Sequence, residues 1–273
     1  MIGQWLILDL PLNDGYRAKE MPTSTDFIDI SNVAGSLPHE LQVAVCVAPA
    51  DSGLPILQQY FNVLYKTYGP QKWWPARTRF EIIVGAILTQ NTSWRNVERA
   101  IRALRRERLL TLAAIAKIST ERLATLIRSS GYFRQKARKL KAFVNFVREQ
   151  YRGSLGRMFR TPTAALRPQL LAVHGIGPET ADSVLLYAGN HRVFVVDAYT
   201  RRILGRHELA HTKSTYEELR RLAEKSLPFE VQGFNEFHAL IVYVGKHFCR
   251  PRAPICSACP LNCFLVRPIE GAL

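Results

Sequence analysis

One aspartate follows directly on a short apolar run in the last third of the chain. Val193–Val196 reads as a buried segment, and Asp197 ends it. An aspartate is rarely buried without a partner, because removing a carboxylate from water costs free energy that hydrogen bonds or charges must offset. Two roles fit this position: Asp197 caps the helix that begins near Ala198, or it stabilises positive charge that develops during a reaction.

Four cysteines form a second group of residues that could do chemistry. They have the spacing C-x6-C-x2-C-x3-C, at Cys249, Cys256, Cys259 and Cys263. Thiolates so closely spaced indicate metal ligation, and either zinc or a [4Fe–4S] cluster accepts four of them. The fifth cysteine, Cys46, lies far from this group in the sequence. Cysteines gathered in one cluster are typical of proteins from a reducing compartment, so we expect a cytoplasmic protein.

A glycine-rich turn precedes Asp197 by about 20 residues and is the element expected to position a ligand near it. The sequence His174–Pro178 separates two apolar runs that have helical spacing. We expect positive φ at both Gly175 and Gly177, which glycine adopts at little cost, and a second helix that begins at the proline. Such a turn presents backbone N–H groups to a phosphate, although an ordinary helical hairpin remains the alternative.

The motif L-x-x-V-x-G-I-G-x-x-T-A-D, followed by V-V-D, resembles the endonuclease III (HhH-GPD) superfamily of DNA glycosylases. The resemblance covers the chain from about Leu57 onward and implies that Asp197 is the catalytic aspartate. It also implies DNA contacts by the wedge residue Gln90 and by the hairpin, the latter through Gly175, Ile176, Gly177, Glu179 and Thr180. Gln90 could equally be a polar residue at a helix C-terminus.

Glu179 departs from the pattern of the bifunctional members, which carry a lysine two residues after the second hairpin glycine. The amine that would attack the sugar and form a Schiff base is therefore absent from that position. The resemblance favours a monofunctional glycosylase, which hydrolyses the bond between base and sugar with water. In that reaction Asp197 stabilises an oxocarbenium-like sugar and orients the attacking water.

Several aromatic residues resemble the base pocket of the branch that removes 3-methyladenine. They are Trp73, Trp74, Pro75 and Trp94, to which Lys246 is added. A methylated adenine is cationic, and a cation over an indole face gains about 0.5–2 kcal/mol. The two alternatives are that Trp74 and Trp94 fill the core and that Lys246 holds a phosphate.

The cysteine spacing matches the superfamily in its first two gaps, C-x6-C-x2-C, but its last gap is shorter than the usual form. The resemblance favours a [4Fe–4S] cluster over zinc. We expect the cluster to have a structural role, fixing a loop that carries basic residues near phosphates.

The expected fold is all-α, because helical spacing recurs and long strands are absent. Helices are predicted over 57–68, 80–88, 94–104, 111–116, 121–129 and 136–151. The resemblance implies the two-domain endonuclease III-like fold with a C-terminal four-cysteine loop. Its domains are a six-helix domain at 78–190 and a second helical domain built from 55–77 and 191–273; residues 1–54 form a loosely ordered extension.

The charge of the chain favours a polyanionic partner. The formal net charge is +15, and the segment 129–160 carries nine lysines and arginines against the single acid Glu149. We therefore expect a monomeric, nucleoid-associated base excision repair enzyme of bacterial type, acting on double-stranded DNA with alkylated bases and without a membrane span. The alternatives are an endonuclease III-type glycosylase and lyase for oxidised, deaminated or mismatched bases, and a helix-hairpin-helix DNA-binding protein without catalysis.

Overall fold

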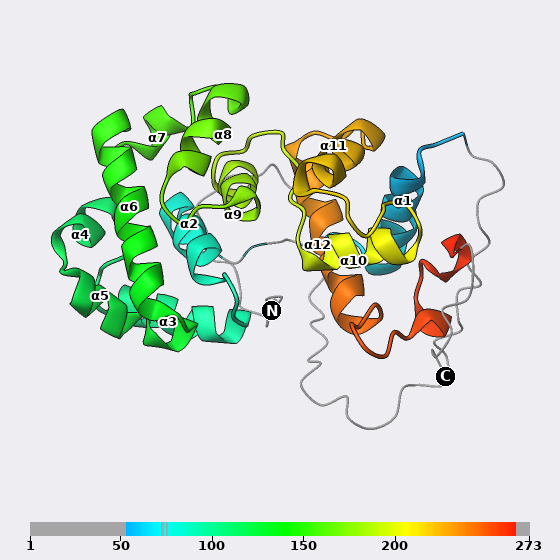
Figure 1. Cartoon of the computed structure of the whole chain (residues 1–273), viewed down its shortest axis with the longest axis horizontal. Coiled ribbons are helices and arrows are strands. Elements are labelled where there is room, and N and C mark those ends of the chain that lie inside the picture. The colour runs from blue at the N-terminus through cyan, green and yellow to red at the C-terminus, as the bar shows by residue number, and fades with distance from the viewer. Residues whose placement is uncertain (1–52, 72–73, 75, 266–273) are drawn as a thin grey trace, which may run out of the picture.

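The computed structural model describes residues 53–71, 74 and 76–265. The predicted all-α class is confirmed: within these residues the chain is helical and contains no strand. The predicted extension falls almost wholly outside the described part. Figure 1 shows the helices in two groups, one formed by α2 to α9 and the other by α1 with α10 to α12.

The first group is built on the long helix α6, which packs against α2, α4 and α5. Its middle face is apolar and fully buried, which explains its central place. The elements of the group are α2 (Arg79–Leu88), α3 (Trp94–Arg106), α4 (Leu112–Lys117), α5 (Thr120–Leu126), η2 (Arg128–Ser130), α6 (Phe133–Tyr151), α7 (Leu155–Met158), α8 (Thr163–Ala172), α9 (Pro178–Ser183) and η3 (Val184–Ala188).

The second group surrounds the apolar helix α12, against which α1 and α10 pack. Its elements are α1 (Ile56–Tyr68), α10 (Ala198–Arg206), α11 (Tyr216–Ser226), α12 (Val231–His247) and the short turns η4 (Cys256–Ala258) and η5 (Asn262–Phe264). A capping box begins α11, where Thr215 and Glu218 bond to each other's backbone N–H groups. The domain bounds given above stay a prediction, although the grouping of the helices follows the same division.

A buried lysine joins the end of α2 to α6. Lys136 is 2% exposed, and its Nζ donates to the carbonyl oxygens of Leu88 (2.9 Å) and Ser130 (2.6 Å). These carbonyls end a helix and a 3-10 turn and would otherwise be buried without donors. The lysine therefore fixes the position of the segment after α2, which enters the site described next.

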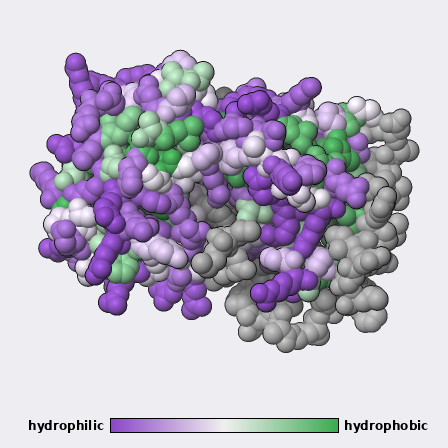
Figure 2. Space-filling view, viewed as in Figure 1, coloured by the Kyte–Doolittle hydropathy of each residue, from purple (hydrophilic) through white to green (hydrophobic). Residues whose placement is uncertain are grey.

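The described surface is largely polar on the face seen in Figure 2, where hydrophilic side chains cover most of both groups. None of the helices in the described ranges combines the length and apolar character that crossing a membrane requires.

Candidate active site

A cavity of about 1150 Å³ is bounded by residues of both helix groups. The first group contributes the end of α2 and one face of α9, and the second contributes the start of α10 and the end of α12. The polar and charged residues of its lining are Thr89, Gln90, Asn91, Glu179, Thr180, Ser183, Asp197, Tyr199, Arg201, Arg202, Tyr216, Lys246, His247 and Arg250. Of the residues singled out in the sequence, Gln90, Glu179, Thr180, Asp197 and Lys246 are thus brought together.

Gln90 is bonded to the hairpin between α8 and α9. Its Nε2 donates to the carbonyl of Gly175 (3.2 Å) and to Oγ1 of Thr180 (2.9 Å), while its Oε1 accepts from Lys139 Nζ. Gly175 has φ +80°, and a Cβ atom there would lie 2.4–2.6 Å from side-chain carbons of Lys139. The turn and the predicted wedge residue therefore form one hydrogen-bonded unit.

The expectation of positive φ at Gly177 was wrong. Gly177 has φ −91° and ψ 177°, and it is the N-cap residue of α9 with Pro178 at the first helical position. An extended N-cap backbone is open to any residue, so this glycine is not required by its φ angle. A Cβ atom at Gly177 would contact nothing in the described residues. Ile176 between the two glycines is 4% exposed and belongs to the core.

Asp197 has the capping role that its sequence position allowed. It is the N-cap of α10, and its Oδ1 accepts from the backbone N–H (2.8 Å) and the hydroxyl (2.9 Å) of Thr200. The residue is only 2% exposed, yet it lines the cavity. The cap occupies one carboxylate oxygen and leaves Oδ2 for other contacts.

Oδ2 of Asp197 lies 3.6 Å from Nε2 of His238, within ion-pair distance. The other ring nitrogen of His238 is bonded to the hydroxyl of Tyr187 at 2.5 Å. Burial alone would raise the pKa of Asp197, but the interaction with His238 and the hydrogen bonds from Thr200 outweigh it and hold the pKa below its usual value. The cavity therefore borders on a carboxylate that is ionised at neutral pH.

Tyr187 belongs to η3, in which Val184–Ala188 form a π-helical turn directly after α9. Such turns are wider than the α-helix and occur often at functional sites. Sequence reasoning did not find Tyr187 or His238, since no local motif marks them and they are 51 residues apart.

The tryptophans form a packed cluster in the core. Trp74 is 8% and Trp94 is 3% exposed, their rings meet edge to face at 5.4 Å, and Trp74 stacks on Tyr187 at 4.9 Å. Both rings pack on Gly85, and neither lines the cavity. The structure thus places them as the core-filling alternative describes. The other two predicted pocket residues, Trp73 and Pro75, lie outside the described residues.

Lys246 lines the cavity at the end of α12, where burial lowers the pKa of its ammonium group. Glu179 belongs to α9 and also lines the cavity. It occupies the position at which bifunctional members of the superfamily carry a lysine.

Three of the four clustered cysteines, Cys249, Cys256 and Cys259, line a small cavity of about 10 Å³ beside α12. Arg206 donates to Sγ of Cys249 at 3.2 Å, so a positive charge lies beside the thiols. Cys263 does not line this cavity and is in a disulfide bond. Within the described ranges, no three Cys, His, Asp or Glu side chains are gathered closely enough to hold a metal ion.

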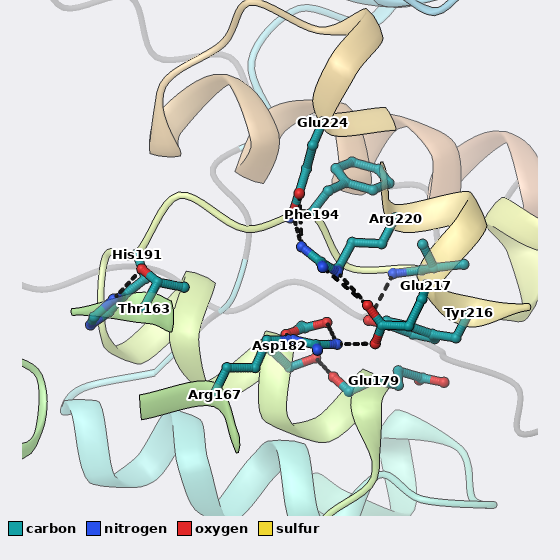
Figure 3. Close-up of polar contacts among 12 residues, drawn as sticks. Thr163, Arg167, Glu179, Asp182, His191, Phe194, Tyr216, Glu217, Arg220 and Glu224 are labelled. Carbon is teal, nitrogen blue, oxygen red and sulfur yellow. Dashed lines mark hydrogen bonds and ion pairs between the residues drawn. The ribbon is translucent and has the colours of Figure 1, made fainter. Parts of the chain in front are cut away.

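A chain of ion pairs joins α8 and α9 to α11, and sequence reasoning missed it entirely (Figure 3). Arg167 binds both carboxylate oxygens of Asp182, at 2.6 and 2.9 Å, and also Glu217 at 2.6 Å. Arg220 joins Glu217 to Glu224 at 3.0 and 2.7 Å. Asp182 is fully buried, so at this end the chain of ion pairs is part of the packed structure rather than a solvated surface network.

Comparison with known proteins gives a consistent assignment. Residues 84–229, more than half of the chain, match the family described as "HhH-GPD superfamily base excision DNA repair protein". A putative DNA repair glycosylase of Methanocaldococcus jannaschii is 45% identical over 77% of this chain and 95% of its own length. Among solved structures, the 3-methyladenine DNA glycosylase of H. pylori, bound to 1,N6-ethenoadenine, is 30% identical with a TM-score of 0.61, covering 70% of this chain and 95% of that one.

A trapped covalent intermediate of endonuclease III with DNA has the same fold, with a TM-score of 0.65 at 22% identity over 75% of this chain and 93% of that one. The predicted endonuclease III-like fold is thereby confirmed. With its helical hairpin, its capping aspartate and these relatives, the chain belongs to the HhH-GPD superfamily of base excision DNA repair proteins.

Proposed function

We propose that the protein is a monofunctional DNA glycosylase that removes alkylated purines, of the 3-methyladenine type, from double-stranded DNA. The observation that carries this proposal is Asp197, an ionised carboxylate bordering a cavity that Gln90 and the hairpin helix also line. A negative charge fixed there would stabilise an oxocarbenium-like sugar as the bond to the base breaks. The carboxylate would also orient the attacking water.

The cavity carries the charges that a nucleic acid requires. Arg201, Arg202 and Arg250 line it beside Lys246, and the helix α9 that follows the hairpin turn lines it as well. Phosphates gain most of their affinity for proteins from such cations and from helix N-termini, without regard to base sequence. A base flipped from the stack would then enter the space between Asp197 and α9.

The choice of alkylated purines rests on the H. pylori relative, which is a 3-methyladenine DNA glycosylase at 30% identity. Trp74 and Trp94 pack against Gly85, whose neighbour Ala86 lines the cavity. Their role is therefore to support the cavity wall and not to contact a base directly. Tyr199 and Tyr216 are tyrosines that line the cavity itself, and of these we propose Tyr199 as the ring that contacts the base.

A panel of duplexes tests the substrate. Each carries one lesion: 3-methyladenine made by alkylation, 1,N6-ethenoadenine, uracil, a mismatched thymine, or an oxidised pyrimidine. We expect release of 3-methyladenine to be the fastest. Release of oxidised pyrimidines alone would replace the proposal with an endonuclease III-type activity, and tight binding without release of any base would indicate a DNA-binding protein.

Borohydride reduction during the reaction tests the absence of lyase chemistry. We expect no covalent protein–DNA adduct, because Glu179 lines the cavity where an attacking amine would be needed. If an adduct does form, its loss in Lys246→Ala would identify Lys246 as the attacking amine.

We further propose that the four clustered cysteines hold a [4Fe–4S] cluster. The donor type fits, since thiols are the ligands of such a cluster and Arg206 would offset their negative charge. Three of the thiols line one small cavity, and they would have to draw closer together than in this structure for the cluster to bind. Cys263 can be the fourth ligand only after its disulfide is reduced. Protein purified without oxygen should absorb near 400 nm and contain iron, and Cys256→Ser should lose both; one bound zinc without that absorption would contradict the proposal.

A further inference from the structure

The segment Val193–Val196 leads to Asp197. Two of its backbone N–H groups are bonded to side chains, whereas in a sheet they would be bonded to a neighbouring strand. The N–H of Phe194 donates to Oε1 of Glu224 at 3.0 Å, and the N–H of Val196 donates to the hydroxyl of Tyr216 at 3.3 Å. In an extended chain, the N–H groups of alternate residues point to the same side. Two residues of α11 therefore fix one edge of the segment immediately before Asp197.

Tyr216 links this edge to the hairpin helix. While its oxygen accepts from Val196, its hydroxyl proton is donated to Asp182 of α9. Burial raises the pKa of Tyr216 well above its usual value, so the hydroxyl keeps that proton at neutral pH. One oxygen atom thus connects the backbone beside Asp197 with a buried carboxylate two residues after Thr180.

The second contact, at Glu224, belongs to the same network (Figure 3). The chain of ion pairs runs from Asp182 through Arg167, Glu217 and Arg220 to Glu224. Both ends of the chain therefore hold the segment before Asp197, one through Tyr216 and the other through Glu224.

Helix α9 is bonded to Gln90 through another residue, Thr180, whose hydroxyl accepts from Gln90 Nε2. One short helix thus connects the predicted wedge residue with the backbone of Val196, directly before Asp197, through Thr180 on one side and through Asp182 and Tyr216 on the other. We propose that Tyr216 and Asp182 are positioning residues that set the place of Asp197 relative to the hairpin. This inference rests on the proposed function, in which Asp197 stabilises the sugar.

Tyr216→Phe is the first test, because it removes one oxygen and keeps the ring. We expect faster amide hydrogen exchange in the segment 193–197 and a single-turnover release of 3-methyladenine slowed about 10- to 100-fold, since a misplacement near 1 Å costs about that much. The dissociation constant for a duplex with a tetrahydrofuran abasic analogue should stay within about twofold, because the DNA contacts are unchanged.

The matched control is Tyr151→Phe, which removes a hydroxyl bonded to Gln169 far from Asp197 along the chain. It should leave exchange at 193–197 and the rate unchanged. Unchanged exchange in Tyr216→Phe, or a rate within twofold of the wild type, overturns the inference. So does an equal loss of rate and DNA binding, which would mean that the whole fold has loosened.

A pair of variants at Asp182 tests the other half of the contact and serves if Tyr216→Phe does not fold. Asp182→Asn keeps an acceptor oxygen for Tyr216, so it should retain more of the rate than Asp182→Ala; equal rates in the two variants overturn the inference. Wild type and Asp197→Asn are measured alongside. If neither releases a base, or both do so equally, the proposed function fails, and the exchange data alone then decide whether Tyr216 holds the segment.

Discussion

Two buried aspartates, Asp182 in α9 and Asp197 at the start of α10, have different surroundings. Both carboxylate oxygens of Asp182 are bound by the guanidinium of Arg167, and Tyr216 adds a further hydrogen bond. Asp197 has only Oδ1 bonded in this way, to Thr200, whereas its Oδ2 has His238 at 3.6 Å as its neighbour.

The difference separates a carboxylate that supports the structure from one that can do chemistry. A buried carboxylate that is paired with an arginine through both oxygens is not open to a substrate, and removing its partner is costly because an uncompensated charge remains. A carboxylate that has one oxygen held by the helix cap, on a residue that lines a cavity, is fixed in place and can still act on a charge that develops nearby. The following predictions test this distinction, beginning with the largest effect.

Replacing Asp197 by Asn should slow base release by about 1000-fold, which corresponds to about 4 kcal/mol in the transition state. At neutral pH the protein should lose only the stability that comes from the lowered pKa of Asp197, because asparagine caps helices as well as aspartate does. Single-turnover excision and thermal unfolding measure the two effects. An active Asp197→Asn protein would remove the catalytic role from this residue.

Replacing Asp182 by Ala should lower the free energy of unfolding by about 3 kcal/mol, since Arg167 would lose its buried partner. Urea denaturation measures this loss. The double variant Arg167→Met with Asp182→Leu should recover much of the stability, because well-packed apolar residues replace the pair. If the double variant is as unstable as Asp182→Ala, then the ion pair stabilises the fold by more than the mutual compensation of its two charges.

Replacing His238 by Gln should move the acidic limb of the pH–rate profile to higher pH, because the interactions that lower the pKa of Asp197 are weakened. At the acidic end the rate should fall by about tenfold relative to the wild type, with little change at alkaline pH. Because the pKa of Asp197 is lower in the folded state than in the unfolded state, ionisation of this residue stabilises the fold at any pH above the unfolded-state pKa. That stability is lost as the pH falls through the folded-state pKa. Superimposable pH profiles would show that His238 does not influence the carboxylate.

The smallest effect is expected at an exposed carboxylate. Glu107 pairs with Arg122 at 3.0 Å, but the two side chains are 43% and 67% exposed. Replacing Glu107 by Gln should change the free energy of unfolding by less than about 0.5 kcal/mol, because water screens such pairs. This variant is the control for the one at Asp182, and a loss comparable to that of Asp182→Ala would contradict the role given to burial.

The helical class could be predicted because apolar spacing is a local property of the sequence. Boundaries were less accurate: the helix predicted over 121–129 ends at Leu126 and continues as a separate 3-10 turn, while α6 begins at Phe133, three residues before the predicted start. The motif resemblance selected residues such as Gln90, Thr180 and Asp197, which the fold places around one cavity.

Contacts between distant segments could not be predicted. Tyr187 meets His238 and Phe194 meets Glu224 only after folding, across 51 and 30 residues. For Trp94 the sequence allowed both a pocket and a core position, and the close packing of its ring on Gly85 decides between them.

The π-helical turn at Val184–Ala188 also affects how the protein could change during evolution. Such a turn contains one residue more than regular helical spacing needs. Losing that residue would tighten the turn and rotate Tyr187 by about 100° around the helix axis, away from His238, while the hairpin upstream kept its shape. A lineage with this deletion could still grip DNA but would have to orient the histidine beside its carboxylate in another way.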